Sequence, residues 1–393
     1  MSYERLMKSI KTNYQIKKEG GYNYIPVGFN RFKNHILGIV RSTQTIVTAS
    51  SGVGKSKFTR YFFVQKALEF VYDKPDIKLR IIIFSLELSA EEYIADILCS
   101  FLKRDYGINI TYRELLSVGD NDTLTEDVIA KLDEYSAWVD YFKKHVVIFT
   151  SIRNPTGIYK EVLKIIKRDF KGSEKEVIDE NGNKEIIYEY EEEGVFIEVI
   201  IDHISLLTQE KHDGILLSPH QTISKMSSDY CLELKNKYQT CNIIVQQQAA
   251  AKEAVEYNYS GKSIDDKLEP SLDGLGDNKL TQRDATDVIG IFAPNRYEIA
   301  QHPKLNGYNI GIMKDSYRSI KKLKDRYGSP NVKIGMYFDG AVGTFEELPK
   351  IDEFDDNKCI KFLKERREEK PIKKKDKETK QFKFNFNSLK EDI

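Results

Sequence analysis

The chain is short of cysteine, and its opposite charges cancel. The cysteines among its 393 residues, Cys99, Cys231, Cys241 and Cys359, lie far apart and form no C-x-x-C pair. This spacing argues against both a zinc site and a disulfide framework, so we expect a reducing compartment. Because 61 Lys and Arg residues balance 61 Asp and Glu residues, net charge points to no anionic partner, and any nucleic-acid site must be a local patch.

The sequence also lacks long apolar segments. No run approaches the roughly 18 apolar residues that a membrane-spanning helix needs. The polar start MSYERLMKSIKTNYQIKKEGG has no apolar core of a secretory signal. We therefore expect a cytoplasmic protein without a membrane partner. The 40% of hydrophobic residues suffice for one large α/β domain with extensions.

From Gln44 onward, short β-rich runs alternate with helical stretches. Strands are predicted at TIVTA (45–49), within LRIIIFSLEL (79–88), and at 145–150, 195–204, 242–247 and 287–292, and helices are predicted at 57–71 and 90–107. This order predicts βαβ units and therefore an α/β fold with a mainly parallel sheet. The strand runs are nearly continuous hydrophobics, which is typical of strands buried on both faces.

Two peripheral segments flank one main domain, which we place at 39–350. Residues 1–38 mix Lys, Tyr, Asn and Gly, and we predict a short helix near Tyr3 to Ser9 followed by an arm. Residues 351–393 become strongly charged, with twelve Lys and Arg against seven Asp and Glu from Lys361 onward. That composition predicts a helix followed by a disordered tail.

Two insertions interrupt the main domain. Residues 171–193 carry nine acidic and three basic residues around an Asn-Gly pair, which predicts an exposed β-hairpin. The stretch from Ala249 to about Lys279 is rich in Gly, Ser, Asp and Lys without sustained periodicity. It is predicted to be a long loop, and loops of that length inside compact domains are usually functional or disordered.

A glycine-containing loop, ASSGVGKS from Ala49 to Ser56, follows one predicted strand and opens a predicted helix. Backbone N–H groups of such a loop can surround a phosphate, because glycine tolerates the dihedral angles required and the helix N-terminus adds positive partial charge. The lysine of the loop reaches the β- and γ-phosphates, and the next hydroxyl binds Mg²⁺. We expect ATP and Mg²⁺ at Ser51, Gly52, Val53, Gly54, Lys55, Ser56 and Lys57. Ala49 departs from the usual first glycine of the motif.

Two acidic residues follow predicted strands. Asp202 ends the apolar run VIID and can hold Mg²⁺ together with Ser56, although acids that end strands are also common in turns. Glu87 follows IIIFSL and can polarise an attacking water, which is the task of a general base. It can equally be an acid at the start of the following helix.

Together these motifs resemble the ATPase domain of the DnaB-like replicative helicases, phage members included, over roughly residues 30–350. In that family the phosphate loop often begins with Ala. A strand that ends F-S-L-E, whose Glu is the catalytic base, matches residues 84–87. The family's I-D-Y-[LI] motif matches 201–204, with His203 in place of Tyr. The resemblance implies a RecA-like P-loop NTPase fold.

The resemblance also implies residues that act on the γ-phosphate. The family's sensor Gln, at the end of a strand, matches Gln247, with Gln246 as the nearby alternative. Its K-x-R-x-G segment, which delivers a Lys and an arginine finger to the neighbouring subunit, matches Lys324, Arg326 and Gly328. The planar guanidinium suits charge spread over the transferring phosphoryl oxygens.

Two other interpretations of these basic residues stay open. Lys314 and Arg318 form a competing pair for the finger, and KKLKDR can simply be a solvated basic face.

As partners, the resemblance implies a homo-oligomeric ring, a hexamer, on single-stranded DNA at a replication fork, in the cytoplasm of a bacterium or a phage-infected cell. Primase, a loader or a single-strand-binding protein are further partners of such helicases. The family usually carries an N-terminal helical domain that binds primase, and the first 40 residues here are too short for it.

The resemblance assigns DNA backbone contacts to the loops at Thr208 to His220 and Ala249 to Lys279. The first contains Lys211 and His212, and the second contains Lys252, Lys262 and Lys267, all able to meet phosphates without reading bases. The tail KKKDKETKQFKFNFN can dock on a replication partner, gather DNA or only improve solubility.

Two other function classes stay open beside the helicase. One is a RecA-type strand-exchange ATPase, and the other is a helicase loader or accessory ATPase without unwinding activity.

Overall fold

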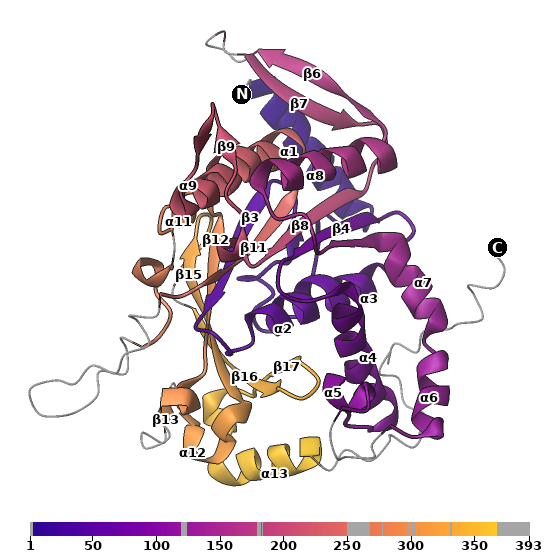
Figure 1. The fold of residues 1–393 in the computed structure, drawn as a ribbon, viewed down its shortest axis with the longest axis vertical. Coiled ribbons are helices and arrows are strands. Elements are labelled where there is room, and N and C mark those ends of the chain that lie inside the picture. Colours follow the sequence, from indigo (N-terminus) through magenta and orange to yellow (C-terminus); the bar gives the residue numbers. More distant parts are fainter. Residues whose placement is uncertain are drawn as a thin grey trace, which may run out of the picture.

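The computed structural model describes residues 3–118, 124–178, 182, 184–249, 268–276, 278–297, 299, 304–305, 307–330 and 332–367. Within these residues, a sheet of nine strands forms the centre of the molecule (Figure 1). The strands lie in the order β17 (Thr344–Glu347), β16 (Lys333–Asp339), β15 (Tyr317–Asp325), β12 (Asp287–Phe292), β3 (Thr43–Ala49), β11 (Cys241–Gln247), β8 (Val195–Asp202), β4 (Lys78–Ser85) and β5 (Val146–Phe149). From β12 to β5 all neighbours are parallel, whereas β15, β16 and β17 pair antiparallel.

The parallel part of the sheet matches the sequence prediction. Every residue of β3 and β8 is buried, as continuous apolar runs require when helices cover both faces. The predicted strands at 145–150, 195–204, 242–247 and 287–292 correspond to β5, β8, β11 and β12, with ends that differ by at most two residues. The prediction of an α/β fold with a mainly parallel sheet is confirmed.

Helices cover the two faces of the sheet. One face packs against the continuous helix of α2 (Lys55–Thr59), η1 (Arg60–Lys66) and α3 (Ala67–Val71), and against α4 (Ala90–Tyr106) and α7 (Ser136–His145). The other face packs against α8 (Pro155–Asp169) and the continuous helix of α9 (Pro219–Ser224), η3 (Lys225–Cys231) and α10 (Leu232–Lys237). The two faces are called the α2 face and the α8 face below.

Shorter elements complete the described fold. They are α5 (Tyr112–Leu115), α6 (Glu126–Asp133), α11 (Thr281–Asp284), α12 (Ile310–Met313), η2 (Ile204–Leu206), η6 (Leu272–Gly274), η7 (Pro294–Tyr297), η9 (Lys314–Ser316) and η10 (Ile351–Glu353). Three small antiparallel pairs join β1 (Tyr24–Ile25) to β2 (Ile39–Val40), β9 (Lys211–His212) to β10 (Ile215–Leu216), and β13 (Lys304–Leu305) to β14 (Tyr308–Asn309). No helix of the described residues is long and apolar enough to cross a membrane.

The antiparallel strand β15 was not predicted, because its sequence YRSIKKLKD looks like a basic surface. Lys322 is nevertheless 4% exposed, and its ammonium group lies 3.1 Å from Asp287 and 2.6 Å from Asp325. Lys321 likewise pairs with Glu269 at 3.5 Å. These tertiary ion pairs neutralise the lysines and let a charged segment lie inside the sheet.

The N-terminal segment is more structured than expected, and the helix predicted in the C-terminal segment is present. Helix α1 runs over Tyr3–Lys18, which extends the predicted helix by nine residues, and residues from Ile25 to Ile36 contribute buried side chains to the main core. Near the other end, α13 (Asp356–Arg367) packs Phe362 against Tyr337 of β16. The tail beyond 367 lies outside the described residues.

The predicted acidic hairpin is present, as β6 (Gly172–Ile178) and β7 (Lys184–Tyr190), and it projects from the body in Figure 1. Cross-strand ion pairs such as Lys184 with Glu176, at 2.8 Å, offset part of its charge. The Tyr190 hydroxyl donates a hydrogen bond to the Tyr238 carbonyl at 2.7 Å and anchors the hairpin to the end of α10.

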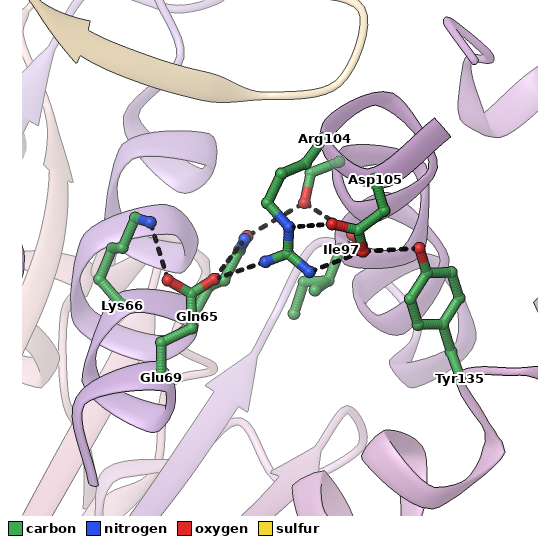
Figure 2. Close-up of polar contacts among 8 residues, drawn as sticks. Gln65, Lys66, Glu69, Ile97, Arg104, Asp105 and Tyr135 are labelled. Carbon is green, nitrogen blue, oxygen red and sulfur yellow. Dashed lines mark hydrogen bonds and ion pairs between the residues drawn. The ribbon is translucent and has the colours of Figure 1, made fainter. Parts of the chain in front are cut away.

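Figure 2 shows a polar network that fixes the α2 face. Glu69 of α3 pairs with Lys66 at 2.7 Å and with Arg104 of α4 at 3.1 Å. Arg104 also pairs with Asp105 at 2.7 Å, and the hydroxyl of Tyr135, just before α7, donates to Asp105 at 2.8 Å. The network therefore ties α4 to the helix that begins at Lys55, and α7 to α4.

One carboxyl group is buried in the middle of the sheet. Glu198 of β8 is 0% exposed, stands in register with Cys241 and Ile81, and has no hydrogen-bond partner for either carboxyl oxygen among the described residues. Burial raises the pKa of Glu198 well above its ordinary value. Burial is the main cause that raises the pKa of the Cys241 thiol to about 12. Burial therefore favours the neutral, protonated form of Glu198.

We expect Glu198→Gln to flatten the pH dependence of stability. Because the pKa of Glu198 is raised in the folded state, its stabilising contribution is complete below its unfolded pKa of about 4.3 and is lost as pH rises toward the folded value. The loss is at most about 1.4 kcal/mol per pH unit. Urea unfolding of both proteins at pH 5 and pH 8 measures it. Equal changes in unfolding free energy for the two proteins would show that Glu198 is not protonated.

Candidate nucleotide-binding site

The phosphate-loop motif lies where β3 ends and α2 begins, at the carboxyl edge of the parallel strands. Gly52 and Gly54 adopt φ angles of 71° and 108°, which explains why glycine occupies both positions. Gly54 immediately precedes α2, and the helix continues without a break through Val71. The loop therefore directs backbone N–H groups and the positive end of a helix toward one place, as phosphate binding requires.

Three side chains of the expected site come together at this edge. The hydroxyl of Ser56 donates a hydrogen bond to Asp202 at 3.1 Å, and the ammonium of Lys55 folds back to the Ser50 carbonyl at 3.0 Å. Asp202 ends β8, two strands away from β3. A hydroxyl and a carboxylate side by side are the oxygen donors with which Mg²⁺ is held while it keeps several waters.

The electrostatics of Asp202 fit such a role. Burial raises the pKa of Asp202 to about 6, the hydrogen bond from Ser56 lowers it, and the charge of Glu87 raises it. Lys55 lowers it further. A buried carboxyl group with an unfavourable negative neighbour is one for which a cation would be a stabilising partner.

Glu87 lies directly after β4 and is exposed, so its carboxylate is free to meet solvent. Its strand is parallel to β8, with Ser85 opposite Asp202 and the Leu86 N–H bonded to the Asp202 carbonyl at 2.7 Å. The capping box of the next helix uses Ser89 and Glu92, so Glu87 is not its capping residue. Its position two residues before Ser89 leaves the interpretation as an acid near the helix start open.

The two candidate sensor glutamines point to opposite faces of β11. Gln246 is buried on the α8 face, where its amide bonds to the Gly276 carbonyl at 2.6 Å and to Thr281 at 2.7 Å. Gln247 stands in register with Ala49 and shares the α2 face with Ile243. No described residue hydrogen-bonds the side chain of Gln247. Gln247 is therefore the one placed toward the phosphate loop.

Lys324 and Arg326 do not join this cluster. Arg326 follows β15, where its backbone N–H bonds to the Thr286 carbonyl at 3.0 Å and its guanidinium to the Arg283 carbonyl at 3.0 Å. Lys324 bonds to the Gln282 carbonyl at 2.5 Å. These contacts lie just before β12 begins. Because β12 runs parallel to β3, and the phosphate loop follows the end of β3, Lys324 and Arg326 lie at the opposite end of the strands from the loop. Neither side chain can reach a nucleotide bound to its own loop.

The competing residue Arg318 has a different place. It is 2% exposed, and its Nε donates to the Val53 carbonyl of the loop at 2.9 Å. A guanidinium buried inside its own subunit is unavailable to a neighbour, so Arg326 remains the candidate finger.

Two residues that no sequence motif singled out border the loop. The Tyr297 hydroxyl bonds to the Ser50 hydroxyl at 3.0 Å, and Arg296 Nη1 lies 3.5 Å from where a Cβ on Gly52 would stand. Both belong to η7, which follows β12, the neighbour of β3. The general rule that ligands bind beyond the carboxyl ends of parallel strands could have singled out the segment PNRY.

The first proposed DNA loop contains a hairpin. Lys211 and His212 form β9, pair with β10, and are exposed, and the turn between the strands carries positive φ angles at Asp213 and Gly214. Lys252, Lys262 and Lys267 of the second proposed loop lie outside the described residues.

The fold and the phosphate loop together define a RecA-like α/β domain. A solved structure of an ATPase domain has this fold, with a TM-score of 0.60 and 17% sequence identity over 88% of this chain and 99% of that one. A DnaB-like replicative helicase, studied with its interactions with primase, has a TM-score of 0.59 and 17% identity over 88% of this chain and 70% of its own. Neither a sequence-family model nor a curated protein sequence matches the chain.

At this level of identity the similarity establishes the fold. It confirms the predicted resemblance to a DnaB-like ATPase domain over most of the chain. The roles of individual residues stay predictions.

We expect Gly54→Ala to distort the loop. An added Cβ would lie 3.3 Å from the Phe338 ring, at a φ of 108° that costs an L-residue about 1–3 kcal/mol. Gly20→Ala is the control, because Gly20 also has a positive φ but no atom within 4 Å of an added Cβ. Calorimetry with Mg-ATP should show weaker binding only for Gly54→Ala. Unchanged affinity would mean that the loop tolerates the side chain.

Proposed function

We propose that the chain is an ATP-dependent DNA helicase that assembles into a ring, a hexamer, translocates on single-stranded DNA and unwinds duplex. The observation that carries the proposal is that the site residues are divided between the two ends of the parallel strands. Lys55, Ser56, Asp202 and Glu87 gather at the carboxyl ends, whereas Arg326 lies at the opposite ends. A complete site then requires a second copy of the chain.

Each side chain at the loop has a chemical task in ATP hydrolysis. Lys55 neutralises charge on the β- and γ-phosphates, and Ser56 and Asp202 hold Mg²⁺ with its waters. Glu87 accepts a proton from the attacking water, for which its exposure and its position beside Asp202 are suitable. Gln247, whose side chain has no hydrogen bond among the described residues, senses the γ-phosphate.

Across the subunit boundary, Arg326 and Lys324 act on the neighbour's nucleotide. Both leave the same strand end and are held there by main-chain carbonyls rather than by carboxylates. Neither forms an ion pair with a carboxylate among the described residues, although Asp284 and Asp287 act on Lys324 at longer range, so both groups are available to phosphoryl oxygens. The planar guanidinium of Arg326 stabilises the charge that spreads over those oxygens in the transition state.

DNA contacts fit the segments that follow β8 and β11. Lys211 and His212 are exposed on the β9–β10 hairpin, where they can meet the sugar-phosphate backbone without reading bases. Primase, a loader or a single-strand-binding protein are the partners we expect of a replicative motor. The relative whose structure was studied with primase motivates the first of these.

ATP hydrolysis and strand separation test the proposal directly. The purified protein should hydrolyse ATP faster with single-stranded DNA and should unwind a forked duplex. Lys55→Ala should lose ATP binding, and Glu87→Gln should keep binding but hydrolyse about 10²–10⁴-fold more slowly. ATPase activity without unwinding would favour a loader or accessory ATPase. An open filament on DNA in electron micrographs would favour a RecA-type strand-exchange protein.

A mixing experiment tests the trans arginine. Arg326→Ala should bind Mg-ATP but lose at least about 10³-fold of its turnover, because the finger is missing. Mixed with Lys55→Ala, it should regain activity at interfaces that combine its intact loop with the other protein's intact Arg326. Arg168→Ala, which alters an exposed arginine paired with Asp169 at 2.6 Å, is the control and should behave as wild type. An inactive mixture of assembled subunits would refute the assignment.

A further inference from the structure

Arg318 is a buried cation at the start of β15 that contacts the phosphate loop. Its Nε donates to the Val53 carbonyl at 2.9 Å, and its Nη1 donates to the carbonyls of Asp315 at 2.7 Å and Tyr317 at 2.8 Å. The single acidic group it meets among the described residues, Asp315, lies 3.5 Å away and is 77% exposed. A surface carboxylate of that kind contributes little, so the guanidinium is held mainly by main-chain oxygens.

An aromatic ring completes this arrangement from the next strand. The Arg318 guanidinium carbon lies 4.4 Å from the centre of the Phe338 ring in β16. The same ring stands 3.3 Å from where a Cβ on Gly54 would be. Val53 itself is 1% exposed. Val53 and Gly54, the two residues before Lys55, therefore rest on Arg318 and Phe338.

The strands beneath this contact are fixed by regular pairing. Arg318 stands opposite Met336 in the β15–β16 ladder, and Ser319, the next residue, stands opposite Phe292 of β12. Since strand ladders move as units, a group on β15 can hold a loop more firmly than a group on another loop can.

We propose that Arg318 is a positioning residue for the phosphate loop: by binding the Val53 carbonyl, it sets the backbone orientation at Gly54 and thereby the direction of the N–H groups that receive the phosphates. A peptide unit is rigid, so fixing the Val53 carbonyl fixes the N–H of Gly54. Positioned beforehand, those groups lose less conformational freedom when nucleotide binds.

The chemistry of arginine explains why this position holds one. A guanidinium presents donors in a planar fork, so Nε and Nη1 can serve the loop and the strand end at the same time, while its flat face stacks on Phe338. A lysine ammonium has no such plane. Lysine at 318 would keep the charge but give up part of this geometry.

The inference rests on the proposed function, because it assumes that the loop binds a nucleotide. It adds a link between two sites of the ring. Arg318 contacts the loop of its own subunit, and Arg326 lies eight residues later, just past the end of the same strand and roughly 26 Å away at about 3.3 Å per residue. Strand β15 thus joins one nucleotide site to the next.

Binding of Mg-ATP by Glu87→Gln protein, which keeps the nucleotide intact, tests the inference. In this background Arg318→Met should raise the Kd for Mg-ATP about tenfold or more, since a hydrogen bond from a charged donor that organises the loop is lost. The Kd of Arg318→Lys should lie between that of the parent and that of Arg318→Met. In the protein that keeps Glu87, Arg318→Met should raise the KM for ATP. Its kcat should stay within about threefold of the wild-type value, because Glu87 and Arg326 are unchanged.

Arg41→Met is the matched control. The Arg41 Nε donates to the Val195 carbonyl at 2.8 Å, and its guanidinium carbon lies 3.9 Å from the centre of the Phe196 ring. Arg41 thus makes the same kinds of contact at the end of the strands away from the loop. Arg41→Met should therefore leave the Kd for Mg-ATP within about twofold of the parent's value.

The outcomes separate the two proposals. If Arg318→Met or, should that protein not fold, Arg318→Lys binds Mg-ATP as tightly as its parent, the positioning role is wrong and the proposed function stands. If Arg41→Met weakens binding to the same extent, general destabilisation explains the effect and the positioning role is again wrong. A Glu87→Gln parent that binds no Mg-ATP would overturn the proposed function and this inference together.

Discussion

Parallel pairing among β3, β11, β8 and β4 is the constraint on which the candidate site depends. Parallel strands end at the same edge of a sheet, so the residues that follow them meet although they are far apart in sequence. Ser56 and Asp202 are separated by 146 positions and lie within a 3.1 Å hydrogen bond. Glu87, after β4, is close enough for its charge to raise the pKa of Asp202.

Burial gives the two acids of β8 different properties. Glu198 and Asp202 are four residues apart and both nearly excluded from solvent. Asp202 lies at the strand end, where Ser56 donates a hydrogen bond and Lys55 supplies positive charge. Glu198 lies inside the sheet without a described partner, and burial alone holds it neutral. Position along one strand therefore decides which acid is available for chemistry.

The antiparallel strands at the other side of the sheet hold a second set of basic residues. Strand β15 carries Arg318 at one end and Lys324 near the other, with Arg326 just beyond it, and these ends face opposite edges of the sheet. Arg318 and Phe338 support the loop that precedes α2, while the network of Glu69 and Arg104 holds α4 on the helix after it. The first contact therefore supports the loop directly, and the second fixes the helices that follow it.

The sequence alone determined the parallel core and the local chemistry of its strand ends. Continuous apolar runs identified β3, β8 and β11, and short-range spacing identified the glycine loop with Lys55 and Ser56, because these features depend on neighbours in the chain. Tertiary structure alone decided that charged β15 enters the sheet, that Gln247 rather than Gln246 faces the α2 side, and that Arg318 is buried. Those outcomes depend on partners such as Asp287, Gly276 and Val53, whose proximity arises only when distant segments pack.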